Sequence, residues 1–141
     1  MPYFNEHALE MSIMELFKDE DYIYLSGDQI HRERTEVLLA DDLRQYLYTR
    51  YAKDGITPSE VDSILLMLRS ISGTIYEANK AVYKMLCDGF IFNREDRTQK
   101  DLYIELIDFD TPGNNIFKVV NQFEIEGVVN ANIYLSHFPG K

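Results

Sequence analysis

The chain has 141 residues, of which 45% are hydrophobic, with 10 Tyr, 8 Phe and no Trp. This is the composition of a globular protein rather than a disordered one, and the length is typical of one domain that buries a core without disulfides or metals. The formal net charge of −10 disfavours a self-sufficient DNA-binding module, because an acidic surface repels the phosphate backbone.

Cellular location is suggested by three features of the sequence. Cys87 is the only cysteine, so no internal disulfide can form, which fits a reducing compartment. The N-terminus has neither the basic start nor the apolar run of a signal peptide. The longest apolar cluster, ILLML at residues 64–68, is far too short to cross a bilayer. The sequence therefore predicts a cytoplasmic protein without membrane contact.

Four helices are predicted in the first two thirds of the chain. Asn5 is a suitable N-cap, and Glu6 places a negative charge at the positive end of the helix dipole. The third helix has the clearest start, because Thr57 precedes Pro58 at the first helical position and Glu60 at the third, the pattern of a capping box. The predicted helices cover residues 5–19, 41–53, 58–73 and 74–88.

After the fourth helix the apolar period changes from 3.6 to 2, which indicates strands. LYIELIDF at residues 102–109 and NIFKVVNQFEI at residues 115–125 flank the turn-forming stretch DTPGNN, so we expect an antiparallel hairpin. Residues 21–27 form either a short strand or an extended link, and a last short strand is expected at residues 132–138. Helices followed by strands indicate an α+β fold rather than a doubly wound sheet.

The first helix carries two carboxylates on its apolar side. Its apolar residues recur at helical spacing, at Leu9, Ile13, Leu16 and Phe17. Glu6 and Glu10 lie within about 40° of each other on the helical wheel and extend this stripe. A carboxylate that faces a core is costly unless it is paired, hydrogen-bonded or bound to a cation. The alternative is that the stripe ends in solvent and both acids only favour the helix dipole.

The remaining polar candidates have no motif around them. The three histidines are scattered along the chain, at His7, His31 and His137. We predict surface positions for them, because a zinc site needs three or four ligands together. Cys87 is expected to be a small buried residue, and Asp108 starts the predicted turn. Asn121 falls among apolar residues of its strand, so its amide is expected to be buried with hydrogen-bond partners.

Three blocks of the sequence resemble a known family. NEHALEMSIMELF at residues 5–17, DYIY at residues 21–24 and LIDFDTPGNNIFKVVNQFEIEG at residues 106–127 are similar, in order and separation, to the N-terminal region of the restriction (R) subunit of type I restriction-modification enzymes. The resemblance spans about residues 3–127. It implies a partial restriction-endonuclease-like nuclease domain of the PD-(D/E)xK type over residues 1–127, followed by a divergent or truncated tail at 128–141.

The resemblance also implies partners and cofactors. In this family the nuclease domain precedes a two-lobed, ATP-driven DNA translocase. The R subunit assembles with methylation and specificity subunits, and the complex cuts double-stranded DNA far from its recognition site in a Mg²⁺-dependent reaction. ATP belongs to the translocase motor, which has no counterpart in these 141 residues.

Glu6 matches an acidic residue of the family's first helix, which implies a catalytic and metal-binding role for it. In the family, an Asp follows the QFE block and a Glu-x-Lys comes shortly after; the acids bind Mg²⁺, which stabilises developing charge and lowers the pKa of the attacking water. Here Asn132 stands at the Asp position, and no Asp or Glu follows Glu126. The resemblance therefore implies that this chain alone neither binds Mg²⁺ nor cuts DNA.

Residues 128–141 depart abruptly from the family pattern. A frameshift or premature stop in a longer gene explains the departure; the competing explanation is genuine divergence, with a closing strand. We favour truncation, because loss of the third strand leaves a sheet edge that natural domains usually protect. Two functions remain open beside a folded domain without activity: an inactive N-terminal fragment of an R subunit, and an acidic interaction module, centred on residues 38–88, that docks to or regulates restriction-modification subunits.

Overall fold

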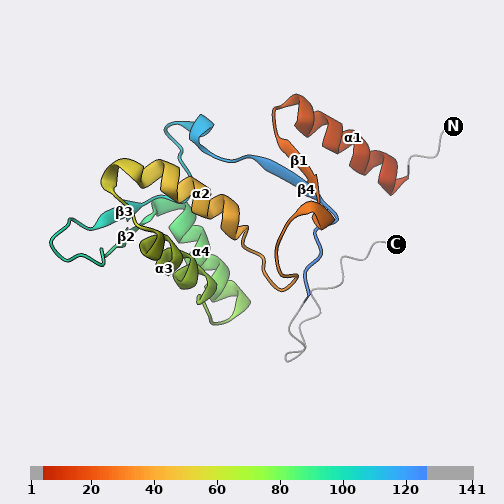
Figure 1. Cartoon of the computed structure of the whole chain (residues 1–141). Helices are drawn as coiled ribbons and strands as arrows, with labels where there is room; N and C mark the ends of the chain where they lie inside the picture. Colours follow the sequence, from red (N-terminus) through yellow and green to blue (C-terminus); the bar gives the residue numbers. More distant parts are fainter. Residues whose placement is uncertain (1–4, 127–141) are drawn as a thin grey trace. The chain divides into compact units, whose positions relative to one another are not determined.

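The computed structural model describes residues 5–126, which form an α+β protein with two compact units (Figure 1). The described part of unit 1 consists of residues 5–37 and 117–126, so its two segments come from opposite ends of the chain. Unit 2 consists of residues 38–116. A length typical of one domain is thus divided between two units, and each unit has its own two-stranded sheet.

Unit 1 is a helix lying against a two-stranded parallel sheet (Figure 1). Its elements are α1 (Glu6–Asp19), β1 (Ile23–Ser26), the 3₁₀ helix η1 (Gly27–Gln29) and β4 (Lys118–Asn121). β1 pairs with β4 in the register Ile23↔Lys118 to Ser26↔Asn121. Aromatic rings join helix and strands, with centroid separations of 4.9 Å for Phe17–Tyr22 and 5.4 Å for Tyr22–Phe117.

Unit 2 combines three helices with a two-stranded antiparallel sheet. Its elements are α2 (Ala40–Tyr51), η2 (Ala52–Asp54), α3 (Pro58–Arg69), α4 (Ile75–Asp88), β2 (Phe90–Phe92), β3 (Leu102–Ile104) and η3 (Pro112–Asn114). β2 pairs with β3 in the register Phe90↔Ile104 to Phe92↔Leu102. Its buried core residues are Tyr46, Leu47, Tyr51, Ile56, Val61, Ile64, Leu65, Leu102 and Ile104. The core of unit 2 is therefore formed by α2, α3 and β3.

All four predicted helices are present, and local capping signals set the starts of α1, α3 and α4. α3 begins with the predicted capping box: the Glu60 N–H donates to Thr57 Oγ1 at 3.2 Å, and the Thr57 N–H donates to Glu60 Oε2 at 3.0 Å. α4 begins with the same arrangement of Thr74 and Glu77. Within residues 5–126, every helix is too short or too polar to span a lipid bilayer.

The predicted hairpin between residues 102–109 and 115–125 is wrong. β3 ends at Ile104 and pairs with β2, a strand that the sequence pattern did not reveal, whereas β4 pairs in parallel with β1. The segment between β3 and β4 leaves strand geometry because its side chains bind one another and Arg50. Turn formers between two apolar stretches therefore mark a link between two sheets here, not a hairpin.

The apolar pattern of α4 does not lead to burial. None of its residues is buried, and Ile75, Tyr76 and Tyr83 are 53%, 74% and 69% exposed. Cys87 is exposed as well, so the prediction of a buried cysteine is wrong. Cys87 lies one helical turn after the exposed Tyr83, on the side of α4 that faces solvent, and this position explains its exposure.

The sequence-predicted core face of α1 is largely uncovered in the described part of unit 1. Met14 is buried and Phe17 half-buried. Leu9, Ile13 and Leu16, however, are 46%, 39% and 61% exposed. The expectation that these three residues face a core is therefore wrong for residues 5–126, because the helix rests on the sheet by its neighbouring face.

Candidate functional site at the start of α1

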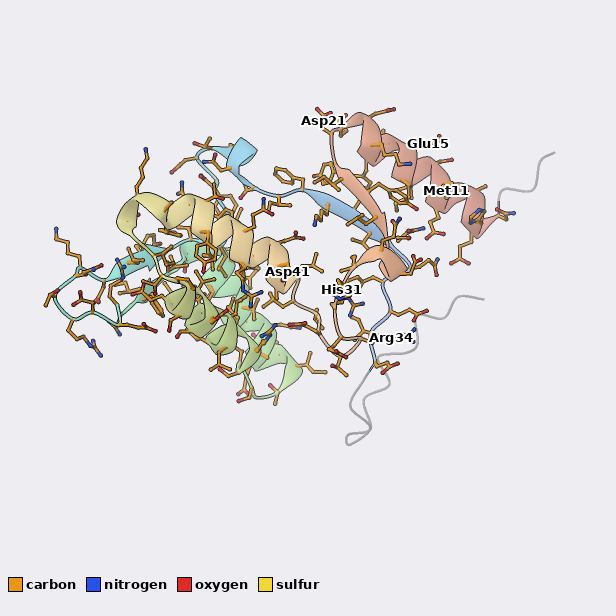
Figure 2. All side chains as sticks on the ribbon, in the orientation of Figure 1. Met11, Glu15, Asp21, His31, Arg34 and Asp41 are labelled. Carbon is orange, nitrogen blue, oxygen red and sulfur yellow. The ribbon has the colours of Figure 1, made fainter. Side chains whose placement is uncertain are left out.

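Glu6 and Glu10 lie one turn apart at the N-terminal end of α1. The turn begins at the predicted cap, since the Asn5 side chain accepts a hydrogen bond from the Ala8 N–H at 2.8 Å. Glu6 is exposed, whereas the Glu10 side chain is 24% exposed. Figure 2 shows the side chains along this helix, with Met11 labelled. Only the second carboxylate is thus partly removed from water.

A residue just beyond β4 holds Glu10 in place. Gln122 Nε2 donates a hydrogen bond to Glu10 Oε1 at 3.1 Å. Gln122 has a φ of 53°, in the left-handed region that residues other than glycine rarely adopt. Gly27 packs against this turn so closely that a Cβ there would lie 2.0 Å from the Gln122 carbonyl oxygen. The start of η1 and the end of β4 therefore meet backbone to backbone, and Gln122 links them to α1.

α1 and the end of β4 border an open hollow of about 730 Å³. It is lined by Asn5, Glu6, His7, Leu9, Glu10, Ile13, Met14 and Gln122. Two carboxylates, two amides and an imidazole form its polar wall, and His7 Nδ1 lies 3.9 Å from Glu10 Oε2. The structure therefore brings the two carboxylates predicted from the helical wheel together with an amide from the other end of the chain.

The donors in this hollow fit part of a magnesium site. Mg²⁺ commonly binds one or two carboxylates and completes its octahedron with water and phosphate oxygens, and Glu6 and Glu10 are two such carboxylates. Nowhere in residues 5–126 do three His, Cys, Asp or Glu side chains gather as metal ligands. The arrangement therefore suits a cation shared with an external anion rather than one enclosed by protein ligands. Asn132, which the sequence resemblance places at the family's Asp position, lies outside the described residues.

Two other sequence predictions are tested by the described residues. His31 is exposed, as predicted, while His137 lies outside the described part of the chain. Asn121 is half-buried, and its Oδ1 accepts a hydrogen bond from Tyr24 Oη at 3.1 Å. The expectation that this amide finds a partner is thus confirmed, and the partner comes from the neighbouring strand β1.

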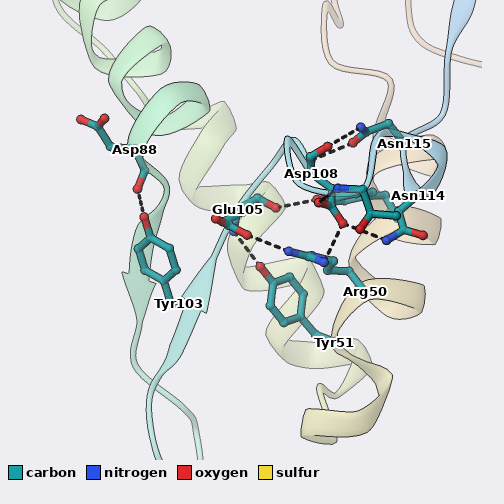
Figure 3. Close-up of polar contacts among 10 residues, drawn as sticks. Arg50, Tyr51, Asp88, Tyr103, Glu105, Asp108, Asn114 and Asn115 are labelled. Carbon is teal, nitrogen blue, oxygen red and sulfur yellow. Dashed lines mark hydrogen bonds and ion pairs between the residues drawn. The ribbon is translucent and has the colours of Figure 1, made fainter.

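A second polar cluster, in unit 2, was not predicted (Figure 3). Arg50 donates from Nη1 to Asp108 Oδ2 at 2.6 Å and from Nη2 to Glu105 Oε2 at 2.7 Å. Asp108 is 1% exposed and also accepts hydrogen bonds from the Asn114 side-chain amide at 2.8 Å and the Thr111 N–H at 2.9 Å. The Asn114 hydrogen bond contributes most to holding the pKa of Asp108 below its ordinary value.

This cluster is built to hold the segment after β3 rather than to react. Tyr46 Oη donates to the Glu105 carbonyl at 3.0 Å, and Tyr51 Oη accepts from the Glu105 N–H at 2.7 Å. Burial is the largest cause that raises the pKa of Tyr46 to about 12. Asp108 does start the predicted turn, but its partner Arg50 is 58 residues away. No local sequence signal points to that pairing.

Comparison with known proteins adds one finding. A family model described as the N terminus of the type I restriction enzyme R protein matches residues 3–134. The match spans both α1 and the end of β4, the two elements that border the hollow. No curated protein and no solved structure matches the chain.

Proposed function

The chain belongs to the family of type I restriction enzyme R protein N termini, and from this premise we propose that it is the N-terminal part of the R subunit's restriction-endonuclease-like nuclease domain. In this proposal α1 and the end of β4 form one wall of the DNA cleavage site. Glu6 and Glu10 face the hollow between them, where the metal and the scissile phosphate meet in the complete enzyme.

One observation carries this assignment within the family. The hydrogen bond from Gln122 to Glu10 joins the first family-like block of the sequence to the last, across 112 residues. A side-chain bond of this kind fixes the direction of a carboxylate that would otherwise be free in solvent. Glu6, Glu10 and the turn at Gln122 therefore line the same hollow. In the family pattern the next strand follows this turn.

The chemistry available to these side chains is that of an incomplete metal site. Glu6, in the first turn, is free to ligate a cation, and Glu10 is oriented by Gln122. Bound Mg²⁺ supplies Lewis acidity and a water of lowered pKa. Because no Asp or Glu follows Glu126, these 141 residues contain no counterpart of the family's second acidic pair. We therefore propose that the chain alone does not cut DNA, and that DNA, ATP and the methylation and specificity subunits act through the complete assembly.

The test uses the 141-residue chain, Mn²⁺ as a paramagnetic stand-in for Mg²⁺, and supercoiled plasmid DNA. The resemblance implies no Mg²⁺ binding by these 141 residues, but the two carboxylates in the hollow lead us to expect a weak, incomplete site. We therefore expect weak Mn²⁺ broadening of the amide signals of residues 6–10 and of Gln122, and no plasmid nicking with Mg²⁺. Glu6→Gln should remove most of the broadening. Glu20→Gln, a matched change of an exposed acid at the other end of α1, should leave it unchanged. Broadening that persists in Glu6→Gln contradicts the metal role, and nicking that disappears in Glu6→Ala contradicts the proposed inactivity.

A second candidate function is an acidic interaction module, and α4 is the observation that favours it. This helix within residues 38–88 buries none of its residues and exposes Tyr76 and Tyr83, and exposed aromatic residues are frequent anchors of protein interfaces. Affinity capture of purified methylation and specificity subunits on the immobilised chain separates the two functions. Tight capture of a subunit that is lost in Tyr76→Ser/Tyr83→Ser favours the interaction module. If neither subunit is captured, the nuclease-domain proposal is the one that stands.

A further inference from the structure

The direction of the Glu10 carboxylate depends on a residue whose own conformation needs support. Gln122, which donates to Glu10 Oε1 at 3.1 Å, is exposed and has a φ of 53°. The left-handed region is unfavourable for a residue that carries a Cβ. One hydrogen bond in contact with water is too weak to hold a backbone there. The chain on both sides of Gln122 must therefore be fixed if its amide is to stay on Glu10.

The sheet of unit 1 fixes the chain before Gln122. β4 pairs with β1 as far as Asn121, which lies opposite Ser26. Gly27 then lets the two backbones come close together, since a Cβ there would lie 2.0 Å from the Gln122 carbonyl oxygen. These contacts determine where the turn at Gln122 begins, but they do not direct the residues that follow it.

Arg32 holds the chain after Gln122. Its guanidinium carbon lies 3.8 Å from the ring centroid of Phe123, and its Nη2 donates a hydrogen bond to the Glu124 carbonyl. A guanidinium is planar and has several donors, so it can stack on a ring and bind carbonyls at its edge at the same time. Its Nη1 donates at 3.0 and 2.8 Å to two carbonyls of its own loop, those of Glu33 and Glu36. One side chain thus fastens the two residues after Gln122 to the loop that carries Arg32.

Arg34, labelled in Figure 2, makes contacts of a different kind. Its Nη1 lies 3.3 Å from Glu124 Oε2 and 3.5 Å from Glu126 Oε1, and the three side chains are 64%, 70% and 62% exposed. Exposed ion pairs of this kind contribute little to stability. Arg32, in contrast, is half-buried and binds backbone carbonyls and a ring. Of the two arginines, Arg32 is therefore the one that positions the chain.

We propose that Arg32 is a positioning residue of the nuclease site: it fixes the turn at Gln122 and, through the Gln122 amide, directs the Glu10 carboxylate into the hollow beside Glu6. Arg32 is not among the described residues that line this hollow, so its action on a bound cation is indirect. The inference rests on the proposed function for the role of the carboxylates. Its geometric part, the contact between Gln122 and Glu10, can be tested without a metal.

Charge and position predict opposite effects of removing Arg32. A positive charge in the same unit repels a cation, so its loss by itself would strengthen cation binding. Loss of a residue that orients a metal-binding side chain weakens cation binding instead. General unfolding of unit 1 would also break the pairing of β1 with β4. The sign of the change in Mn²⁺ affinity, measured with that pairing intact, therefore identifies a positioning role.

The test uses the 141-residue chain, labelled with ¹³C and ¹⁵N, and Mn²⁺ alone as the probe. In the wild type we expect a nuclear Overhauser effect between the Gln122 side-chain amide and the Glu10 side chain. Arg32→Met should lose this effect and weaken Mn²⁺ binding at least about threefold, while the effects between β1 and β4 remain. Arg34→Met removes the same charge two residues away; it should keep the Gln122–Glu10 effect and should not weaken Mn²⁺ binding.

A second variant keeps every charge of the chain. Phe123→Leu removes the ring on which Arg32 stacks, and we expect the same two changes as in Arg32→Met, each smaller in size. If Arg32→Met no longer shows the pairing of β1 with β4, Phe123→Leu decides between the two outcomes, because it leaves the hydrogen bonds of Arg32 to the backbone in place.

Three results would overturn the proposal. The first is the absence of the Gln122–Glu10 effect in the wild type. The second is its persistence in both Arg32→Met and Phe123→Leu. The third is Mn²⁺ binding that is as tight in Arg32→Met as in Arg34→Met. Failure of the proposed function gives a different result: if the wild type shows no Mn²⁺ broadening, the metal role of the carboxylates falls, and the Gln122–Glu10 effect still decides whether Arg32 positions them.

Discussion

Replacing Arg94 by methionine removes the partner of a carboxylate buried in unit 2. Glu60 and Arg94 are 1% and 4% exposed, and Arg94 Nε lies 2.7 Å from Glu60 Oε1. The two terminal nitrogens of Arg94 donate to the carbonyl oxygens of Asp54 and Gly55, each at 2.9 Å. Burial alone raises the pKa of Glu60, but its hydrogen bonds, led by that from Arg94, together lower it below its ordinary value.

Breaking one side of a buried ion pair costs about 3–5 kcal/mol, because the other charge stays buried alone. We therefore expect Arg94→Met to lower the free energy of unfolding of unit 2 by about 3–5 kcal/mol at pH 7. With a urea m-value of about 2 kcal/mol/M, the midpoint falls by about 1.5–2.5 M. Because the folded pKa of Glu60 is lowered, this stabilisation is present above the unfolded pKa of about 4.3 and is lost as the pH falls through the folded value.

Urea unfolding followed by far-ultraviolet circular dichroism and tyrosine fluorescence measures this loss, since the chain has no Trp. The double variant Glu60→Leu/Arg94→Met should recover most of it, to within about 1–2 kcal/mol of the wild type, because the capping box remains lost. Arg44→Met is the surface control: Arg44 and Asp62 pair at 3.1 Å with side chains 37% and 63% exposed, and we expect a cost below about 1 kcal/mol. If Arg94→Met lowers the free energy of unfolding by no more than Arg44→Met does, the reasoning about burial is refuted.

Two further variants test other contacts. Asn114→Ala should move the acid unfolding midpoint of unit 2 to higher pH, because the Asn114 amide contributes most to lowering the pKa of Asp108. A lowered carboxyl pKa stabilises the fold until the pH falls through that pKa. Circular dichroism from roughly pH 6 to pH 2 measures the midpoint, and an unchanged midpoint in the variant would contradict this prediction. Gly27→Ala should raise hydrogen exchange of the β4 amides by about tenfold or more, because the added Cβ would lie 2.0 Å from the Gln122 carbonyl oxygen. Gly113→Ala, whose Cβ would meet nothing within 4 Å, should leave exchange unchanged, and equal protection in both variants would show that Gly27 tolerates a side chain.

The helices are predictable because their signals are local. Asn5 and Thr57 cap helices within three residues of themselves, and such hydrogen bonds form wherever the following residues become helical. Glu6 and Glu10 were found in the same way, from spacing along a single helix. The family resemblance also needs no tertiary information, since it rests on the order and separation of short sequence blocks.

The strand pairs and the partners of the polar residues depend on contacts across long stretches of chain, and there the predictions from pattern fail. β1 pairs with β4 from the far end of the chain, so the expected hairpin does not form. Gln122 reaches Glu10 across 112 residues, and Arg50 reaches Asp108 across 58. An alternating strand pattern identifies which face is apolar but not which strand lies beside it. Local hydrogen bonds thus give the chain its helices, whereas only the packing of distant segments decides which carboxylates share a hollow and which face of α1 is left open.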